Sequence, residues 1–126
     1  MKTAIGLCMV VKNEINRITE CIEPIFDLLD RIVIVDDGST DGTPELLRRR
    51  FGIAVVRKET GRENWLCDLR NMAFDMTDTP WILTLDADER IAPETLERFS
   101  HASHELDVDG YFGPWVNHTG DESFED

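Results

Sequence analysis

Two short apolar runs in this chain each stop at a cluster of aspartates. The first run, 32–35, leads into the letters DDGS at 36–39, and the second, 81–85, leads into DAD at 86–88. A short run rich in Val, Ile and Leu that ends at turn residues predicts a buried strand. In open α/β sheets, ligands bind in the crevice outside the carboxyl ends of the strands. We therefore expect both acidic clusters at one edge of a sheet, facing one ligand.

The rest of the chain alternates between predicted strands and predicted helices. Strands are expected at 4–11, 32–35, 53–56, 81–85 and 110–116. Helices are expected at 15–29 with a break at Pro24, from 43 to about 52, at 65–76 with Trp65, Leu69, Met72 and Met76 on one face, and from Pro93 onward with Leu96 and Phe99 inward. This alternation predicts an α/β fold, in which helices cover both faces of a mostly parallel sheet.

Composition limits what such a fold could bind. The 126 residues suit one domain, 41% of them are hydrophobic, and the net charge of −13 argues against nucleic acid and anionic membranes as partners. No segment approaches the ~18 apolar residues of a membrane span. The three cysteines are an odd number without metal-ligand spacing, so we expect buried free thiols in a reducing compartment and a cytoplasmic protein.

The two acidic clusters favour different chemistry. Asp86 and Asp88 are two residues apart, which places both carboxylates on one side of an extended segment. Mg²⁺ and Mn²⁺ prefer oxygen ligands, and Mg²⁺ takes one or two carboxylates together with substrate phosphates. Asp36 and Asp37 can accept hydrogen bonds from a base or a ribose. In either cluster the alternative is an ordinary turn, for which Asp, Gly and Ser are common residues.

Four blocks together resemble a known family. They are VVKNE at 10–14, VDDGSTDGT at 35–43, RN at 70–71 and LDADE at 85–89. In this order and spacing they resemble family 2 glycosyltransferases with the GT-A fold, including small bacterial enzymes that build lipopolysaccharide cores and related cell-envelope glycans. The resemblance runs from residue 3 to about 117.

The resemblance implies a nucleoside-diphosphate sugar as donor, with UDP expected and GDP and dTDP open, and Mn²⁺ or Mg²⁺ as cofactor. Asp37, together with Asp36, would contact the base or ribose, and Asp88 would bind the metal directly. Asp86 would act through the ribose, a sugar hydroxyl or a metal-bound water. The remaining expected nucleotide-sugar contacts are Val10, Val11, Lys12, Glu14, Arg62, Arg70 and Ala87.

The implied reaction is sugar transfer to a hydroxyl of a carbohydrate or lipid-linked acceptor, with inversion at the anomeric carbon. We expect residues 1–126 to form the donor-binding domain, with an incomplete acceptor side that begins at about 110. The catalytic base is unassigned. Glu122, Glu125 and Asp126 are candidates only as carboxylates beyond the donor site, and the expectation for 121–126 is a frayed acidic tail. The alternative is a non-catalytic nucleotide-sugar-binding module, or one that needs a second copy or a partner chain.

Three other enzyme and signalling classes fit the pattern less well. A response-regulator receiver domain needs its acid pair after the first strand and a Lys after the fifth, but no Lys follows Lys58. Sugar-nucleotide pyrophosphorylases have a Gly-rich basic loop after the first strand, where this chain has VVKNE. A haloacid-dehalogenase-type phosphatase has Thr or Val two residues beyond its second Asp, where this chain has Arg90.

Overall fold

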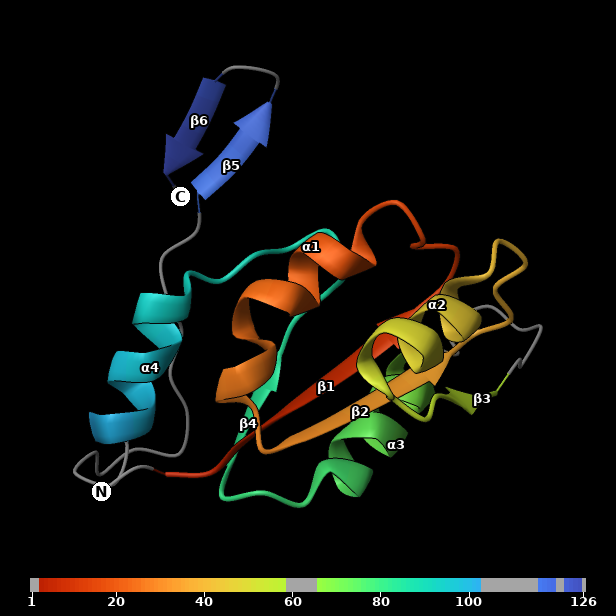
Figure 1. The fold of residues 1–126 in the computed structure, drawn as a ribbon, viewed down its shortest axis with the longest axis horizontal. Coiled ribbons are helices and arrows are strands. Elements are labelled where there is room, and N and C mark those ends of the chain that lie inside the picture. The colour runs from red at the N-terminus through yellow and green to blue at the C-terminus, as the bar shows by residue number, and fades with distance from the viewer. Residues whose placement is uncertain (1–2, 59–65, 103–115, 120–121, 126) are drawn as a thin grey trace.

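A computed structural model describes residues 3–58, 66–102, 116–119 and 122–125. Its main sheet has four parallel strands in the order β3-β2-β1-β4, shown in Figure 1. The strands are β1 (Ile5–Val11), β2 (Arg31–Asp36), β3 (Val56–Arg57) and β4 (Trp81–Thr84). The parallel α/β fold predicted from the sequence is therefore confirmed.

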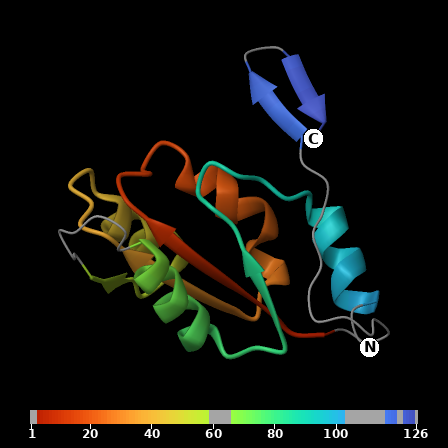
Figure 2. The same ribbon diagram turned by 180° about the vertical axis from the view of Figure 1, so that it is seen from behind.

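Helices cover both faces of this sheet. They are α1 (Ile18–Ile22), the 3-10 helix η1 (Glu23–Leu28), α2 (Thr43–Phe51), α3 (Leu66–Thr77) and α4 (Pro93–Ala102). One hydrophobic cluster joins α1, η1, α2 and α4 to the sheet, and a second joins α3 to it. Helix α3 lies on the opposite face of the sheet, which is turned toward the viewer in Figure 2. Strand β1 is apolar at almost every position because it contributes to both clusters.

The helix after β1 breaks where the sequence predicts. Helix α1 ends at Ile22, and the chain tightens into η1 with Pro24 in its first turn. Proline is tolerated there because the first turn of a helix has no internal acceptor for its missing N–H.

The third strand is shorter than predicted. Only Val56 and Arg57 pair with β2, instead of 53–56. Helix α2 ends at Gly52, which has φ +70°, and the Ile53 amide still donates to the Leu47 carbonyl oxygen over 3.3 Å. This helix-terminating bond holds Ile53 close to α2, so the chain reaches β2 only at Val56.

The inner face of α3 also differs from the prediction. Leu69 is buried as expected, but Ala73 and Thr77 complete the buried row, Met72 is only half-buried and Met76 is 38% exposed. The predicted contact at position 65 lies outside the described residues. The small row fits a close approach between helix and sheet, because a Cβ on Gly6 of β1 would lie 2.4 Å from Thr77 Cγ2.

The last described elements form a separate two-stranded antiparallel sheet. Strands β5 (Val116–Thr119) and β6 (Glu122–Glu125) pair so that Asn117 lies opposite Phe124. The expectation of a frayed tail is wrong for Glu122–Glu125, because these residues have main-chain partners in β5. The strand predicted at 110–116 falls, apart from its last residue, outside the described residues. Leu96 of α4 is buried as predicted, and Phe99 packs edge-on against Trp81.

Candidate functional site

Parallel pairing brings the ends of β1, β2 and β4 to one edge of the sheet (Figure 1). Val11 of β1 lies beside Asp36 of β2 in the register, and the Asp37 amide donates to the Val11 carbonyl oxygen over 2.9 Å. Strand β4 runs on the other side of β1 and ends at Thr84, just before the second acidic cluster. We call this side of the molecule the acidic edge: 10–14, 36–41 and 86–90.

Asp36 holds the turn that follows β2. Its side chain is fully buried, and Oδ1 accepts hydrogen bonds from the amides of Gly38 at 2.9 Å and Ser39 at 2.8 Å. The Arg57 guanidinium lies 3.8 Å from the same oxygen. The other oxygen, Oδ2, has no hydrogen-bond partner among the described residues. Most of what Asp36 does in this structure is therefore to fix the turn.

Asp37 links the ends of β1 and β2. Its side chain is 3% exposed, and the ammonium group of Lys12, which is 55% exposed, lies 4.0 Å from Oδ2. Val10 and Val11 lie just before Lys12 at the end of β1, with Val11 buried. The structure therefore brings together four of the predicted contacts at this point.

Asn13 is a residue of this edge that was not among the predicted contacts. It has φ +55°, a left-handed conformation that Asn adopts more readily than most residues. Its amide donates to Ser39 Oγ, and its side-chain oxygen accepts from the Thr40 amide, both over 2.8 Å. The signal in the sequence was an Asn two residues after the end of an apolar strand, where turns commonly contain this residue.

Asp41 extends the same cross-link to helix α2. It accepts hydrogen bonds from the Ile15 amide at 3.1 Å and from the amide and hydroxyl of Thr43 at 3.0 and 2.5 Å. Burial opposes ionisation of the Asp41 carboxyl, but these hydrogen bonds outweigh it and hold the pKa below its ordinary value of 3.8. Glu14 donates its amide to Thr43 Oγ1, while its carboxylate is paired with Arg17 at 2.8 Å.

The second acidic cluster is a tight turn rather than the extended segment expected. The Glu89 amide donates to the Asp86 carbonyl oxygen over 2.9 Å, and the Asp86 amide donates to Glu89 Oε1 over 2.8 Å. Ala87 is 3% exposed, whereas the Asp86 side chain is 51% exposed and Asp88 is also exposed. The turn therefore buries its alanine and leaves both aspartates accessible to solvent.

Arg70 of α3 lies beside this turn. Its Nη2 atom is 3.4 Å from each carboxylate oxygen of Asp86, and both side chains are about half exposed, at 54% and 51%. The structure therefore places Arg70, which was predicted to contact the nucleotide-sugar, next to the second acidic cluster. The predicted contact Arg62 lies outside the described residues.

The acidic edge could hold a hard cation only with help from a ligand. No group of three or more His, Cys, Asp or Glu side chains that could hold a metal occurs within the described ranges. Asp86 and Asp88 offer carboxylate oxygens, and the remaining coordination positions would need water or phosphate. That donor set fits Mg²⁺ or Mn²⁺, because Mg²⁺ in particular is usually held by one or two carboxylates together with substrate phosphates.

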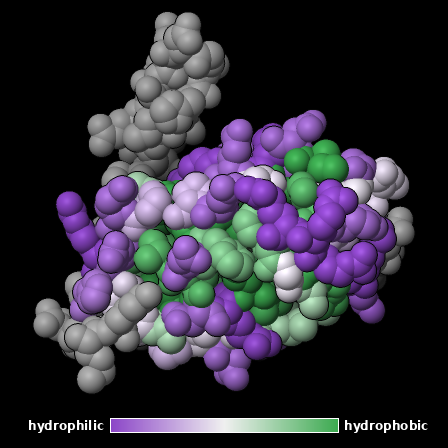
Figure 3. Space-filling view, in the orientation of Figure 1, coloured by the Kyte–Doolittle hydropathy of each residue, from purple (hydrophilic) through white to green (hydrophobic). Residues whose placement is uncertain are grey.

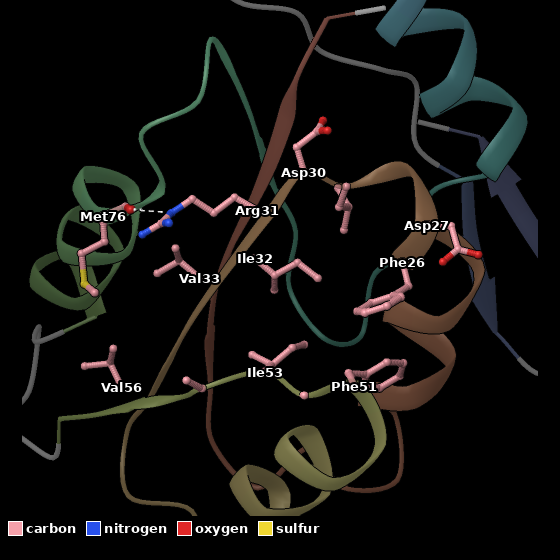
Figure 4. A pocket seen from close by; sticks show the side chains of 13 residues that line it. Phe26, Asp27, Asp30, Arg31, Ile32, Val33, Phe51, Ile53, Val56 and Met76 are labelled. Atoms are coloured by element: carbon pink, nitrogen blue, oxygen red, sulfur yellow. Dashed lines mark hydrogen bonds between the residues drawn. The ribbon is translucent and has the colours of Figure 1, made fainter.

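A pocket of about 600 Å³ lies elsewhere, along the first half of β2 (Figure 4). Phe26, Phe51, Ile32 and Ile53 line it, and Arg31 donates to the Met76 carbonyl oxygen over 3.1 Å. In the space-filling view, apolar surface gathers in this area between η1 and α3, whereas the surface over α2 is mainly hydrophilic (Figure 3). The pocket contains none of the predicted site residues.

None of the described helices has the length and apolar character needed to cross a membrane.

Comparison with known proteins shows the family of this chain. The sequence profile of Glycosyl transferase family 2 matches residues 7–125. This chain belongs to that family. An uncharacterized glycosyltransferase of Rickettsia felis is 30% identical over 107 residues, which are 82% of this chain and 36% of that protein.

Solved structures of glycosyltransferases share the fold. TarS of S. aureus (residues 1–349) superimposes with a TM-score of 0.69 at 24% identity, over 89% of this chain and 38% of that one. The mannosyltransferase PcManGT of Pyrobaculum calidifontis, solved in complex with GDP-Man and Mn²⁺, gives a TM-score of 0.62 at 23% identity, over 82% and 33%. The family 2 chain therefore has a GT-A fold and spans roughly a third of the length of these proteins.

Proposed function

We propose that this family 2 chain binds a nucleoside-diphosphate sugar, with UDP as the first candidate nucleotide, and takes part in transferring the sugar to an acceptor hydroxyl with inversion and with a divalent metal. The observation that carries the proposal is the contrast between two neighbouring acidic turns. One has a buried carboxylate pair at the ends of β1 and β2, and the other exposes Asp86 and Asp88 beyond β4.

The exposure and position of each residue suggest its role in binding the nucleotide or the metal. Asp37, next to Lys12, lies where a base or ribose could meet the ends of β1 and β2, with Val10 and Val11 beside it. Asp88 is the metal ligand in this proposal, and Asp86 shares its charge between Arg70 and the ligand. Three further residues support these positions. Asp36 fixes the turn after β2, Glu14 pairs with Arg17, and Ala87 buries its methyl group under the second turn.

The proposed chemistry follows from charge. The diphosphate leaving group gains negative charge as the glycosidic bond breaks, and a bound divalent metal supplies Lewis-acid stabilisation of that charge. Arg70 lies beside the second acidic turn, where its positive charge can also stabilise the negative charge on the diphosphate. A hydroxyl of a carbohydrate or lipid-linked acceptor then attacks from the opposite face, and a carboxylate base accepts its proton. That base is not assigned to any residue of this chain.

Related proteins support the donor class. TarS has been solved in complex with UDP, and PcManGT with GDP-Man and Mn²⁺. We place the reaction in the cytoplasm, in the service of a cell-envelope glycan, as part of the same proposal. The buried free thiols of Cys8 and Cys21 are typical of a reducing compartment.

Thermal unfolding of the chain with UDP, GDP or dTDP, each with and without Mn²⁺, tests the donor site. Ligand at a hundred times its dissociation constant stabilises a protein by about 2.7 kcal/mol. For a domain of this size the midpoint should rise by roughly 5–15 °C. We expect one nucleotide to give a Mn²⁺-dependent rise that is absent in Asp88→Ala. No rise with any nucleotide, or the same rise in the variant, would contradict the donor site or the metal ligand, respectively.

The second candidate is a nucleotide-sugar-binding module without transfer activity of its own. It is favoured by one fact, that the chain spans only about a third of the proteins it resembles. Release of a labelled sugar from the donor that binds best separates the two. Release that depends on Mn²⁺ and on Asp88 supports transferase chemistry. Binding without release supports the module, alone or completed by a second copy or a partner chain.

A further inference from the structure

Arg90 is a residue of the acidic edge to which the proposed function gives no role. It lies at the end of the second acidic turn, with its side chain 39% exposed. Its Nη1 atom donates to the carbonyl oxygens of Ala87 at 2.7 Å and Glu89 at 2.8 Å. These two carbonyls belong to the residues on either side of Asp88, so one guanidinium nitrogen holds the backbone on both sides of the exposed aspartate.

The same guanidinium connects this turn to another part of the chain. Nη2 donates to the Arg17 carbonyl oxygen at 3.2 Å, where α1 begins, and lies 3.7 Å from the Glu20 carboxylate. In Figure 1 the connection from β4 to α4 passes beside α1, which is where these contacts occur. Cys21 of α1 adds a weak contact, with Sγ 3.7 Å from the Asp86 carbonyl oxygen. Contacts from α1 therefore reach the turn at both Asp86 and Arg90.

Only an arginine can make this set of bonds. Its planar fork presents several N–H donors in fixed directions, whereas a lysine ammonium is a point charge on a flexible stem. A cation also suits the charge of this segment, because the Glu20 carboxylate lies 3.7 Å from the guanidinium and Asp86, Asp88 and Glu89 precede Arg90 in the chain. Without Arg90, the carbonyl oxygens of Ala87 and Glu89 would lose this donor, and the turn would keep the two Asp86–Glu89 hydrogen bonds and the weak contact from Cys21.

We propose that Arg90 is a positioning residue for the metal-binding turn: it fixes the backbone around Asp88 so that the carboxylates of Asp86 and Asp88 are already placed when a divalent cation and a diphosphate arrive. This inference rests on the proposed function, because it assumes that the turn binds metal. Residues that orient metal ligands without touching the metal typically change metal affinity by about 10–100-fold when they are replaced.

The test compares Arg90→Gln and Arg90→Lys with the wild-type chain by calorimetric titration of UDP, with and without Mn²⁺. We expect the Mn²⁺-dependent gain in UDP affinity to fall about tenfold in Arg90→Gln, and by less in Arg90→Lys, which keeps the charge but not the fork. UDP affinity without Mn²⁺ should stay unchanged in both. Arg50→Gln is the matched control, since Arg50 pairs with Glu23 at 2.7 Å away from the acidic edge.

A second readout needs no ligand. In Arg90→Gln the amides of Asp86 and Glu89, which close the turn, should exchange their hydrogens at least tenfold faster, while the amides of β1 and β2 keep their wild-type rates. Unchanged exchange at these two amides, or an unchanged Mn²⁺-dependent gain, would overturn the positioning role. If wild type binds no nucleotide but exchange at the turn accelerates as expected, the proposed function fails and the positioning of the turn by Arg90 stands.

Discussion

The two acidic turns have similar sequences, but their aspartates differ in solvent exposure. In the turn after β2, Asp36 and Asp37 are 0% and 3% exposed, and Asp36 accepts hydrogen bonds from two amides of its own turn. In the turn after β4, the Asp86 side chain is 51% exposed, and the buried position belongs to Ala87. Aspartates in the first turn therefore build the edge of the sheet, and those in the second remain accessible to a ligand. A count of acidic residues cannot separate these roles.

Replacement of one aspartate from each turn should show the largest difference. Asp36→Ala removes the acceptor of the half-buried Gly38 amide and the buried Ser39 amide, and each hydrogen bond to a charged group contributes about 1.5–3 kcal/mol. We expect the free energy of unfolding to fall by about 3 kcal/mol, measured by urea denaturation. Asp86→Ala should change it by less than about 0.5 kcal/mol, as exposed positions usually do. Equal losses in the two variants would refute the contrast between the turns.

Asp41 gives the first turn a dependence on acid. Its carboxylate accepts from two amides near the start of α2, so Asp41→Ala should lower the free energy of unfolding by about 1 kcal/mol at neutral pH. Because its pKa is lower when folded than the ordinary 3.8, this contribution is present above that value and is lost as pH falls below it. In Asp41→Asn, the free energy of unfolding measured by denaturation between pH 2 and 7 should fall less steeply as the pH is lowered. If the stability of wild type and Asp41→Asn fell equally at low pH, the hydrogen bonds assigned to Asp41 would be contradicted.

Two ion pairs, one at each acidic turn, extend the comparison to smaller effects. Lys12 reaches a carboxylate that is 3% exposed, whereas Arg70 reaches one that is 51% exposed. Solvent screens the second pair more strongly, so Arg70→Met should change the free energy of unfolding by less than about 0.5 kcal/mol. Lys12→Met should cost more, up to about 1 kcal/mol, because it leaves Asp37 buried without its cation. The measurement is urea denaturation at low and high salt, and the opposite ranking would be inconsistent with the burial of Asp37.

Cysteine labelling probes the second turn without any change in stability. Burial raises the pKa of the Cys21 thiol to about 11, although Arg90 beside it acts in the opposite direction. Cys67, by contrast, is exposed on α3. Iodoacetamide at pH 8 should therefore modify Cys67 first and Cys21 much more slowly, which mass spectrometry can follow. Fast labelling of Cys21 would mean that the second turn and α1 separate more readily than their contacts suggest.

The sequence predicted the structure correctly where a local pattern allows only one structural interpretation. Val- and Ile-rich runs predicted β1, β2 and β4, Pro24 predicted the break after α1, and the order of four motifs predicted the family and the fold. The expected burial of all three cysteines was wrong for Cys67, which is exposed although it stands beside an apolar residue. Neighbouring letters do not say which side of a helix will meet the sheet.

Four features were decided by tertiary contacts. The buried row of α3 consists of Leu69, Ala73 and Thr77, because Gly6 of β1 allows the helix close to the sheet. Strand β3 starts late because Ile53 is held to α2. Asn13 and Arg90 matter for bonds that span 27 and 73 residues of sequence. The residues near each partner in the sequence do not say which distant residue it will bond.

The sequence by itself determined that the segments of β1, β2 and β4 become strands, the family of the chain, and the placement of both acidic clusters at one edge, since parallel strands end on the same side. Only the tertiary structure decided which aspartates are buried. That depends on long-range contacts: the Asp37 amide donates to Val11 of β1, the Arg57 guanidinium lies 3.8 Å from Asp36, and Arg90 of the second turn donates to Arg17. A carboxylate is buried where donors surround it and stays in water where its own backbone turns outward, and both conditions depend on residues distant in the chain.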